Sequence, residues 1–138
     1  MIDFSYQTDF ELLHEKEVGL WIGNIIEGEG FTEGEISYVF CDDAFLLTIN
    51  KEFLNHDTFT DIISFDYSLG KQVHGEIYIS IERVLENSKR YESKFIDELH
   101  RVLIHGVLHY CGYKDKTESS MGEMRDKEED ALAKRTFA

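Results

Sequence analysis

The sequence contains no proline, only two cysteines, and half as many basic as acidic residues. It also lacks low-complexity stretches, so it shows no candidate interdomain linker, and we expect residues 1–138 to form one domain. The cysteines, Cys41 and Cys111, lack the spacing of a disulfide framework. We therefore expect reduced thiols, a cytoplasmic location and no disulfide-linked partner. No apolar run approaches the ~18 residues of a membrane span, and Met1–Tyr6 does not resemble a signal peptide.

The shortage of basic residues leaves 14 Lys and Arg against 28 Asp and Glu, a formal net charge of −14. Indiscriminate binding to nucleic acid depends on Lys and Arg displacing phosphate counterions, so this balance argues against it. It favours solubility or recognition of a basic partner. The segment 83–101 is richer in bases, but acidic residues lie among them, which is typical of a solvated, salt-bridged surface.

Hydrophobic periodicity predicts about four strands interleaved with helices. The strands are expected at residues 2–6, 35–41, 61–67 and 75–81. The helices are expected from a cap at Asp9 to Gly28, from 42 to about 53, and over 82–91, 95–110 and 118–134. This order indicates an α/β (α+β) domain with one mixed, about four-stranded sheet packed by helices. The helix over 95–110 is apolar almost all round and should be buried.

Two histidines four residues apart, His105 and His109, lie inside this apolar helix. Residues i and i+4 share one helix face, so both imidazoles can reach one ion. Gly112 can take the left-handed conformation that ends a helix, and this would let the chain reverse and bring Asp115 towards the imidazoles. Two nitrogens and one oxygen with a fourth position open form a metal site suited to hydrolysis.

Each of these residues also has a structural interpretation. The histidines could be core residues bonded to backbone, although burying two unpaired imidazoles would be costly. Asp115 could cap the last helix, and Cys111 and Glu118 are rival ligands. Gly106 stands where a zinc peptidase of the His-Glu-x-x-His type has its glutamate base, which argues against a peptidase. Gly106 would serve either close helix packing or space beside the metal.

The run from His105 to Asp115 resembles the His-Gly-x-Leu-His-x-x-Gly-Tyr-Asp-His signature of the YbeY family. Two upstream segments fit as well: Thr60–Phe65 is similar to the family's Thr-Asp-Val-Leu-Ser-Phe strand, with Asn50 and Phe53 before it, and Gly75–Ser80 to its Gly-Asp-Ile-x-Ile-Ser strand. The resemblance covers essentially the whole chain. It implies a bacterial, single-strand-specific zinc endoribonuclease that matures the 3′ end of 16S ribosomal RNA and supports ribosome quality control.

The chain departs from this family pattern at the third metal-ligand position and at the position of the arginine thought to contact phosphate. Asp115 stands where the family has its third histidine, with Lys114 before it, which implies a His105, His109 and Asp115 ligand set. Aspartate is a competent zinc ligand, but an anionic oxygen acidifies bound water less and makes Mn²⁺ or Fe²⁺ more plausible alternatives to Zn²⁺. Leu54 stands where many members have an arginine thought to contact phosphate.

Four further residues are candidates for supporting roles. His56 and Arg101 could contact the scissile phosphate, although a solvated loop residue and a surface ion-pair partner are the simpler interpretations. Asp61 and Ser64, near the strand that the resemblance places by the cleft, could support the ligands through hydrogen bonds. Ordinary turn and strand chemistry would also explain them. The sequence identifies no general base.

Three functions are therefore open. The leading hypothesis is metal-assisted hydrolysis of single-stranded RNA, with ribosomal RNA and the ribosome or its small-subunit proteins as partners, and no membrane. The second is a metal-dependent hydrolase of another ester or amide, peptidases included. The third is a ribosome-assembly factor whose metal is structural, which would need four protein ligands.

Overall fold

The centre of the protein is a mixed, four-stranded sheet with the strand order β1-β2-β4-β3. The structure is a computed structural model that describes residues 1–137. β1 (Ile2–Tyr6) pairs in parallel with β2 (Thr32–Cys41), and β2 pairs in parallel with β4 (Gln72–Ser80). β3 (Ile62–Asp66) runs antiparallel to β4 and forms one edge. The expected α/β fold with one mixed, four-stranded sheet is confirmed.

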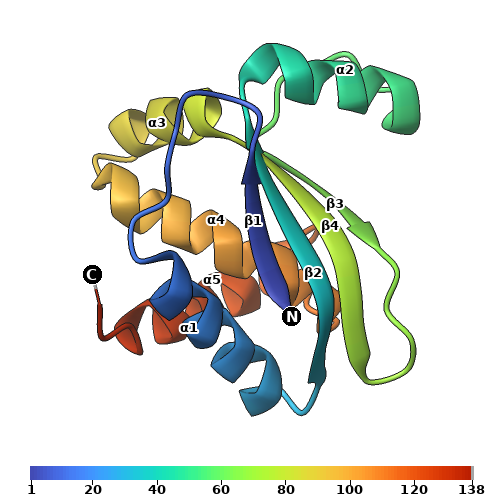
Figure 1. The fold of residues 1–138 in the computed structure, drawn as a ribbon, viewed down its shortest axis with the longest axis vertical. Coiled ribbons are helices and arrows are strands. Elements are labelled where there is room, and N and C mark those ends of the chain that lie inside the picture. Colours follow the sequence, from blue (N-terminus) through green and yellow to red (C-terminus); the bar gives the residue numbers. More distant parts are fainter. Residues whose placement is uncertain (138) are drawn as a thin grey trace.

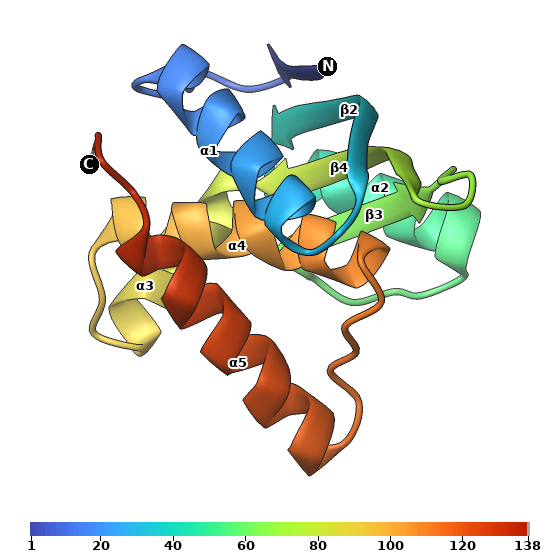
Figure 2. The ribbon, with the colours of Figure 1, turned by 90° about the horizontal axis from the view of Figure 1, so that it is seen from below.

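Helices lie on both sides of this sheet (Figures 1 and 2). α4 (Phe95–Tyr110) packs across one face, against β3 and β4, and α1 (Glu15–Gly28), α3 (Ile81–Arg90) and α5 (Glu118–Ala133) pack against α4. α5 lies outside α4, so that α4 is enclosed between α5 and the sheet (Figure 2). α2 (Asp43–Leu54) lies on the opposite side, against β3 and β4.

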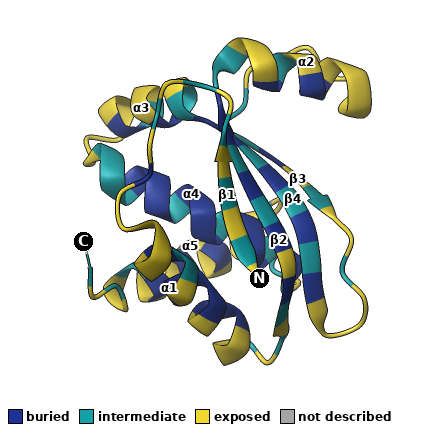
Figure 3. Ribbon diagram, viewed as in Figure 1, coloured by how far each residue is buried: buried dark blue, intermediate teal, exposed yellow. Residues whose placement is uncertain are grey.

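α4 is the central helix of the core. Ten of its 16 residues are buried, as the dark band along it in Figure 3 shows. Its apolar side chains contact the alternate residues of the sheet that face it, including Tyr38, Phe40, Ile77 and Ile79, all of them fully buried. The Tyr38 hydroxyl donates a 2.7 Å hydrogen bond to the carbonyl of Leu103 and fixes the helix on the sheet. The prediction of a buried helix over these residues is confirmed.

The sequence placed most elements within a few residues of their observed bounds, with one clear error at the start of α1. The helix begins at Glu15 and not after Asp9, and His14 precedes it in a left-handed conformation at φ 58°. The reason is tertiary packing. Leu12 is buried in the core and its amide donates to the Tyr6 hydroxyl, so the segment before Glu15 follows the sheet and is not helical.

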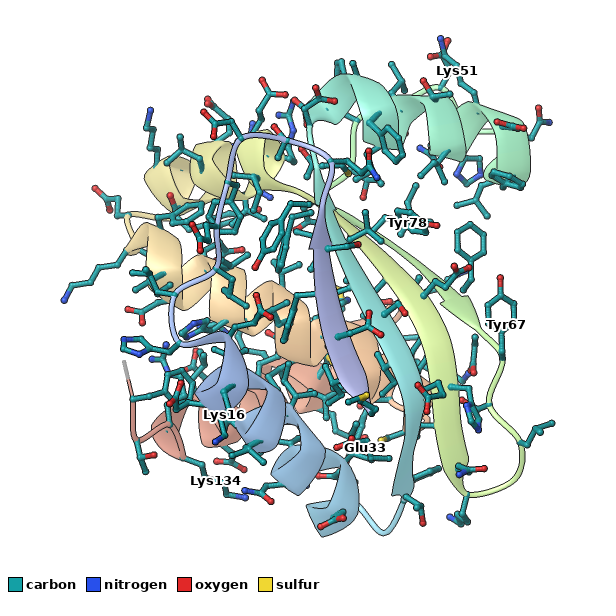
Figure 4. The ribbon with its side chains drawn as sticks, viewed as in Figure 1. Lys16, Glu33, Lys51, Tyr67, Tyr78 and Lys134 are labelled. Atoms are coloured by element: carbon teal, nitrogen blue, oxygen red, sulfur yellow. The ribbon has the colours of Figure 1, made fainter. Side chains whose placement is uncertain are left out.

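The face of the sheet next to α2 carries a second, smaller apolar cluster. Its buried members are Cys41, Leu46, Ile49 and Ile63. Tyr78 lies on this face near α2, whereas Tyr67 lies further from α2, just after β3 (Figure 4), and is 56% exposed. Within residues 1–137 no helix has the length and apolar character required to cross a membrane. Cys41 and Cys111 are both free thiols, as expected.

Candidate metal centre

His105 and His109 lie one turn apart on α4 and direct their Nε2 atoms to the same place. The two Nε2 atoms are 3.0 Å apart, and the rings meet edge to face. Both side chains are partly exposed, at 22% and 31%, although the helix around them is buried. The imidazoles therefore lie at a solvent-accessible part of an otherwise buried helix, which argues against the interpretation as core histidines.

Asp115 reaches the imidazoles because the chain reverses at the end of α4. Gly112 has φ +99°, a conformation that glycine adopts without strain, and its amide donates to the carbonyl of His109. Asp115 Oδ2 then lies 3.2 Å from Nε2 of His105 and 3.3 Å from Nε2 of His109. The sequence-based expectation that this turn carries the carboxylate back to the histidines agrees with the geometry.

The alternative roles and rival ligands lie elsewhere. The cap of α5 is Thr117, whose hydroxyl accepts from the Ser120 amide at 3.1 Å, so Asp115 does not cap that helix. Glu118 is the first residue of α5. Cys111 is not in the cluster, and burial raises the pKa of its thiol to about 11.

The three converging atoms fit a divalent ion. Tetrahedral zinc with metal–ligand distances of ~2.0–2.1 Å holds its ligand atoms about 3.3 Å apart. The separations of 3.0, 3.2 and 3.3 Å between the two Nε2 atoms and Oδ2 are close to that value. Within residues 1–137 these three residues form the one group of three or more His, Cys, Asp or Glu side chains close enough to share an ion. Three protein ligands leave a coordination position open, which catalytic sites require.

Each imidazole is oriented through its other ring nitrogen. Nδ1–H of His109 donates to the carbonyl of Tyr113 at 2.9 Å, and Nδ1–H of His105 donates to Oε2 of Glu128 at 2.7 Å. An oxygen that accepts from Nδ1 leaves the Nε2 lone pair free for a metal. The Tyr113 carbonyl belongs to the turn that follows α4, whereas the carboxylate of Glu128 comes from α5.

Glu128 was not among the candidate residues predicted from the sequence. It is 6% exposed, and it occupies the buried stripe of α5 between Met124 and Ala131. An acidic residue on an otherwise apolar stripe was the signal that could have found it. Burial alone would lower the pKa of His105, but the hydrogen bond and charge of Glu128 raise it above its usual value.

Arg101 is bound by carboxylates and does not line the cleft beside the metal centre. One guanidinium nitrogen lies 3.1 Å from Oε1 of Glu128, and another pairs with Glu129. The Arg101 side chain is partly exposed, at 20%, and the neighbouring Glu98 is buried. This is the ion-pair role that the sequence offered as the alternative to phosphate contact. The guanidinium neutralises Glu128, which would otherwise be a buried, unpaired charge.

A cleft of about 660 Å³ lies beside His109 and is formed by α2 and the loop after it, β3, the end of α4 and the α4–α5 loop. His56 lines it from the α2–β3 loop, and Ser64 lines it from β3. Asn50, which is 3% exposed, holds this loop through a 2.8 Å bond from Nδ2 to the carbonyl of Thr58. The structure thus brings His56 and Ser64 to the same cleft as His109 and Asp115.

Asp61 lies just before β3, and its carboxyl interacts electrostatically with His105. Burial raises the pKa of its carboxyl, and the attraction of His105 opposes that rise. Asn87 on α3 donates to its Oδ2 at 3.4 Å. Asp61 therefore adds negative charge near His105 without touching the three converging atoms.

Gly106 serves packing and not substrate space. A Cβ at this position would lie 2.9 Å from Cδ1 of Ile77 and 3.2 Å from Cδ1 of Ile62. The missing side chain lets α4 approach β3 and β4 closely.

Comparison with known proteins adds a family to this geometry. The family described as "Endoribonuclease YbeY" matches residues 4–136. The protein of that name from Flavobacterium psychrophilum is 56% identical over 132 residues, which cover 96% of this chain and 94% of the relative. The one from Bacteroides thetaiotaomicron is 40% identical, with 95% and 98% covered. The solution structure of TM1509 from Thermotoga maritima superposes with a TM-score of 0.68 at 25% identity, covering 96% of this chain and 87% of that one.

Proposed function

This chain belongs to the YbeY endoribonuclease family, and from this premise we propose that it hydrolyses single-stranded RNA at a metal held by His105, His109 and Asp115. The observation that carries the proposal is the convergence of two Nε2 atoms and one carboxylate oxygen within 3.3 Å at the rim of an open cleft. We further propose that residues 1–138 form a single hydrolase domain around this centre.

A divalent ion bound there supplies Lewis-acid polarisation of a phosphoryl oxygen and lowers the pKa of water. The residues of the chain provide the geometry. Glu128 and the Tyr113 carbonyl orient the two rings so that each Nε2 faces Asp115. Zinc fits two imidazoles and one carboxylate, and the hard oxygen of Asp115 also allows Mn²⁺ or Fe²⁺.

The remaining candidates take different roles. His56 and Ser64 line the cleft and are placed to contact the substrate, His56 as a phosphate-binding residue. Asp61 supports His105 through the attraction between its carboxylate and the imidazole. Arg101 is engaged by Glu128 and Glu129, so we assign it to positioning Glu128 and not to phosphate binding.

We propose ribosomal RNA as the substrate and the cytoplasm as the setting, with maturation of the 3′ end of 16S RNA and ribosome quality control as the tasks. The negative charge supports delivery of the strand by the ribosome or its small-subunit proteins, since a chain of net charge −14 binds naked RNA weakly.

The test is His109→Ala, compared with His14→Asn. His14 is an exposed histidine with a left-handed backbone that asparagine tolerates, and it lies outside the cluster. We expect His109→Ala to lose bound metal, measured by elemental analysis, and to lose cleavage of single-stranded RNA, whereas His14→Asn keeps both. Cleavage by purified His109→Ala at the parent rate would refute the proposal.

The two alternative functions make different predictions. A structural metal would have a fourth protein ligand, and a metal-free variant would still sediment with ribosomal subunits. A peptidase would degrade casein or a peptide library when zinc is restored. Gly106 occupies the position of the peptidase glutamate, and the three-residue cluster leaves a position open, so both observations favour the ribonuclease.

A further inference from the structure

Two side chains on opposite loops of the cleft, one aromatic and one positively charged, have no role in the metal centre described above. Phe59 lines the cleft from the α2–β3 loop, and Lys116 lines it from the α4–α5 loop, next to Asp115. An aromatic ring and a cation in one cleft are the two elements with which proteins hold single-stranded nucleic acid.

Phe59 is an aromatic side chain held in an exposed position. The residue is 56% exposed, although phenylalanine residues in folded proteins are usually buried. The guanidinium carbon of Arg83 lies 5.1 Å from the ring centroid, and Arg83 is itself fixed by a 2.8 Å ion pair with Asp43. Asn50 anchors the neighbouring Thr58 carbonyl. The ring is thus supported from α2 and α3 and presents a π surface in the cleft.

Lys116 is the one lysine or arginine among the described residues that line this cleft. It is exposed and takes part in no ion pair within residues 1–137. The cleft also contains Asp66 and Asp115, so an entering phosphodiester would meet two carboxylates. A metal at the centre offsets the charge of Asp115, and Lys116 is then the side chain that can neutralise a phosphate beside it.

We infer that Phe59 and Lys116 grip one RNA strand across the metal centre, with Phe59 stacking on an unpaired base and Lys116 contacting a phosphate. This inference rests on the proposed function, and it explains how the enzyme would distinguish a single strand from a duplex. A base inside a duplex is stacked on its neighbours and cannot reach Phe59, whereas a base in a loop or at an end can be turned out. Lys116 binds the backbone and is indifferent to sequence.

The test measures binding of a fluorescently labelled single-stranded RNA oligonucleotide by anisotropy, with the RNA checked for integrity on a gel. We expect Phe59→Ala to weaken single-strand binding about tenfold, the lower range of the loss of one base–aromatic stack. Binding to a duplex of the same sequence should not change, and Phe59→Tyr should restore single-strand binding. Tyr91→Ala is the matched control, because Tyr91 is 62% exposed and does not line the cleft.

For Lys116 the readout is the salt dependence of binding. Removing one phosphate contact lowers the slope of log affinity against log salt by about 0.7 for a single strand. We expect this change in Lys116→Ala and its absence in Lys116→Arg. Lys114→Ala is the matched control, because Lys114 has the same charge two residues away but does not line the cleft.

The outcomes separate this inference from the function on which it rests. Wild-type protein that neither binds nor cuts RNA would overturn both. Wild-type protein that binds and cuts RNA, with Phe59→Ala and Lys116→Ala indistinguishable from Tyr91→Ala and Lys114→Ala, would overturn the inference alone.

Discussion

Replacing Glu128 with glutamine tests whether a residue of α5 tunes a metal site on α4. The glutamine has the same size and can still accept the hydrogen bond from Nδ1 of His105 through its amide oxygen. It removes the negative charge, however. When the amide oxygen accepts from His105, the amide NH₂ group faces the guanidinium of Arg101, which carries only donors and cannot accept a hydrogen bond from it. The variant therefore keeps the shape of the site and changes its electrostatics.

The size of the effect follows from the contacts. Glu128 lies 2.7 Å from His105 Nδ1 and 3.1 Å from Arg101, and its side chain is 7% exposed, so both interactions are charge-assisted and shielded from water. Loss of an orienting carboxylate behind a ligating histidine weakens metal binding ~10–100-fold, which is about 1.4–2.7 kcal/mol. The cost to folding should be lower than the ~3–5 kcal/mol of an orphaned buried charge, because Arg101 keeps its pair with Glu129.

The assay is a competition titration of the metal-free protein with Zn²⁺ against a chromophoric chelator, together with urea unfolding. Glu129→Gln is the matched control. It also removes a carboxylate that pairs with Arg101. Glu129 is 56% exposed, however, and its hydrogen bond is with Arg101, whereas the carboxylate that accepts from His105 belongs to Glu128. We expect Glu129→Gln to bind Zn²⁺ within about twofold of the parent. Equal zinc affinity in the parent and Glu128→Gln, or equal losses in both variants, would refute the role of Glu128.

Two further predictions concern the scaffold. A Cβ on Gly75 would lie 2.2 Å from the Tyr110 hydroxyl and 2.6 Å from the Phe65 carbonyl, so Gly75→Ala should destabilise the fold by about 2–3 kcal/mol in urea unfolding, whereas Gly122→Ala, in open space on α5, should be neutral or stabilising. Burial, and then the neighbouring charge of Arg135, lower the pKa of His100 to about 4. Between about pH 6.5 and pH 4 the His100 imidazole is therefore protonated in the unfolded chain but neutral in the folded chain. The free energy of unfolding should decrease as the pH falls through this range. Relative to His100→Gln, the parent should lose about 2 kcal/mol between about pH 7 and pH 4.5, and parallel pH profiles of the two proteins would contradict this assignment.

The sequence predicted the elements of the fold well where the pattern of apolar residues was strong. The helix over Phe95–Tyr110 has the predicted bounds, because its apolar run is preceded by the polar residues Glu92–Lys94 and followed by the turn at Gly112. The strands were predicted within a few residues because β-branched and aromatic side chains alternate along them. The early start predicted for α1 was wrong, because the packing of Leu12 against the sheet is a long-range effect that no local cap residue reveals.

The order of strands could not be read from the sequence in the same way. A mixed sheet was expected, but the central position of β4 between β2 and β3 depends on which faces the helices cover. β2 and β4 are each buried on the face against α4, and β4 also contacts α2 on the other side. The short β3 lies at the edge, which leaves its exposed residues Ser64 and Asp66 to line the cleft.

The metal centre shows the same division between local and long-range information. His105, His109 and Asp115 are joined by one helix turn and one glycine-mediated reversal, so their spacing alone predicted that they meet. The Tyr113 carbonyl that orients His109 is only four residues away. Glu128 is 23 residues from His105, and although its place on the stripe of Met124 and Ala131 sets it apart on α5, nothing in the sequence indicates its partner. Its role follows only once α5 packs on α4, because that contact removes the carboxylate from water and leaves His105 and Arg101 as its partners. One histidine is therefore oriented by the turn that ends its own helix and the other by the docking of the next helix. This makes the packing of α5 a condition for the orientation of His105.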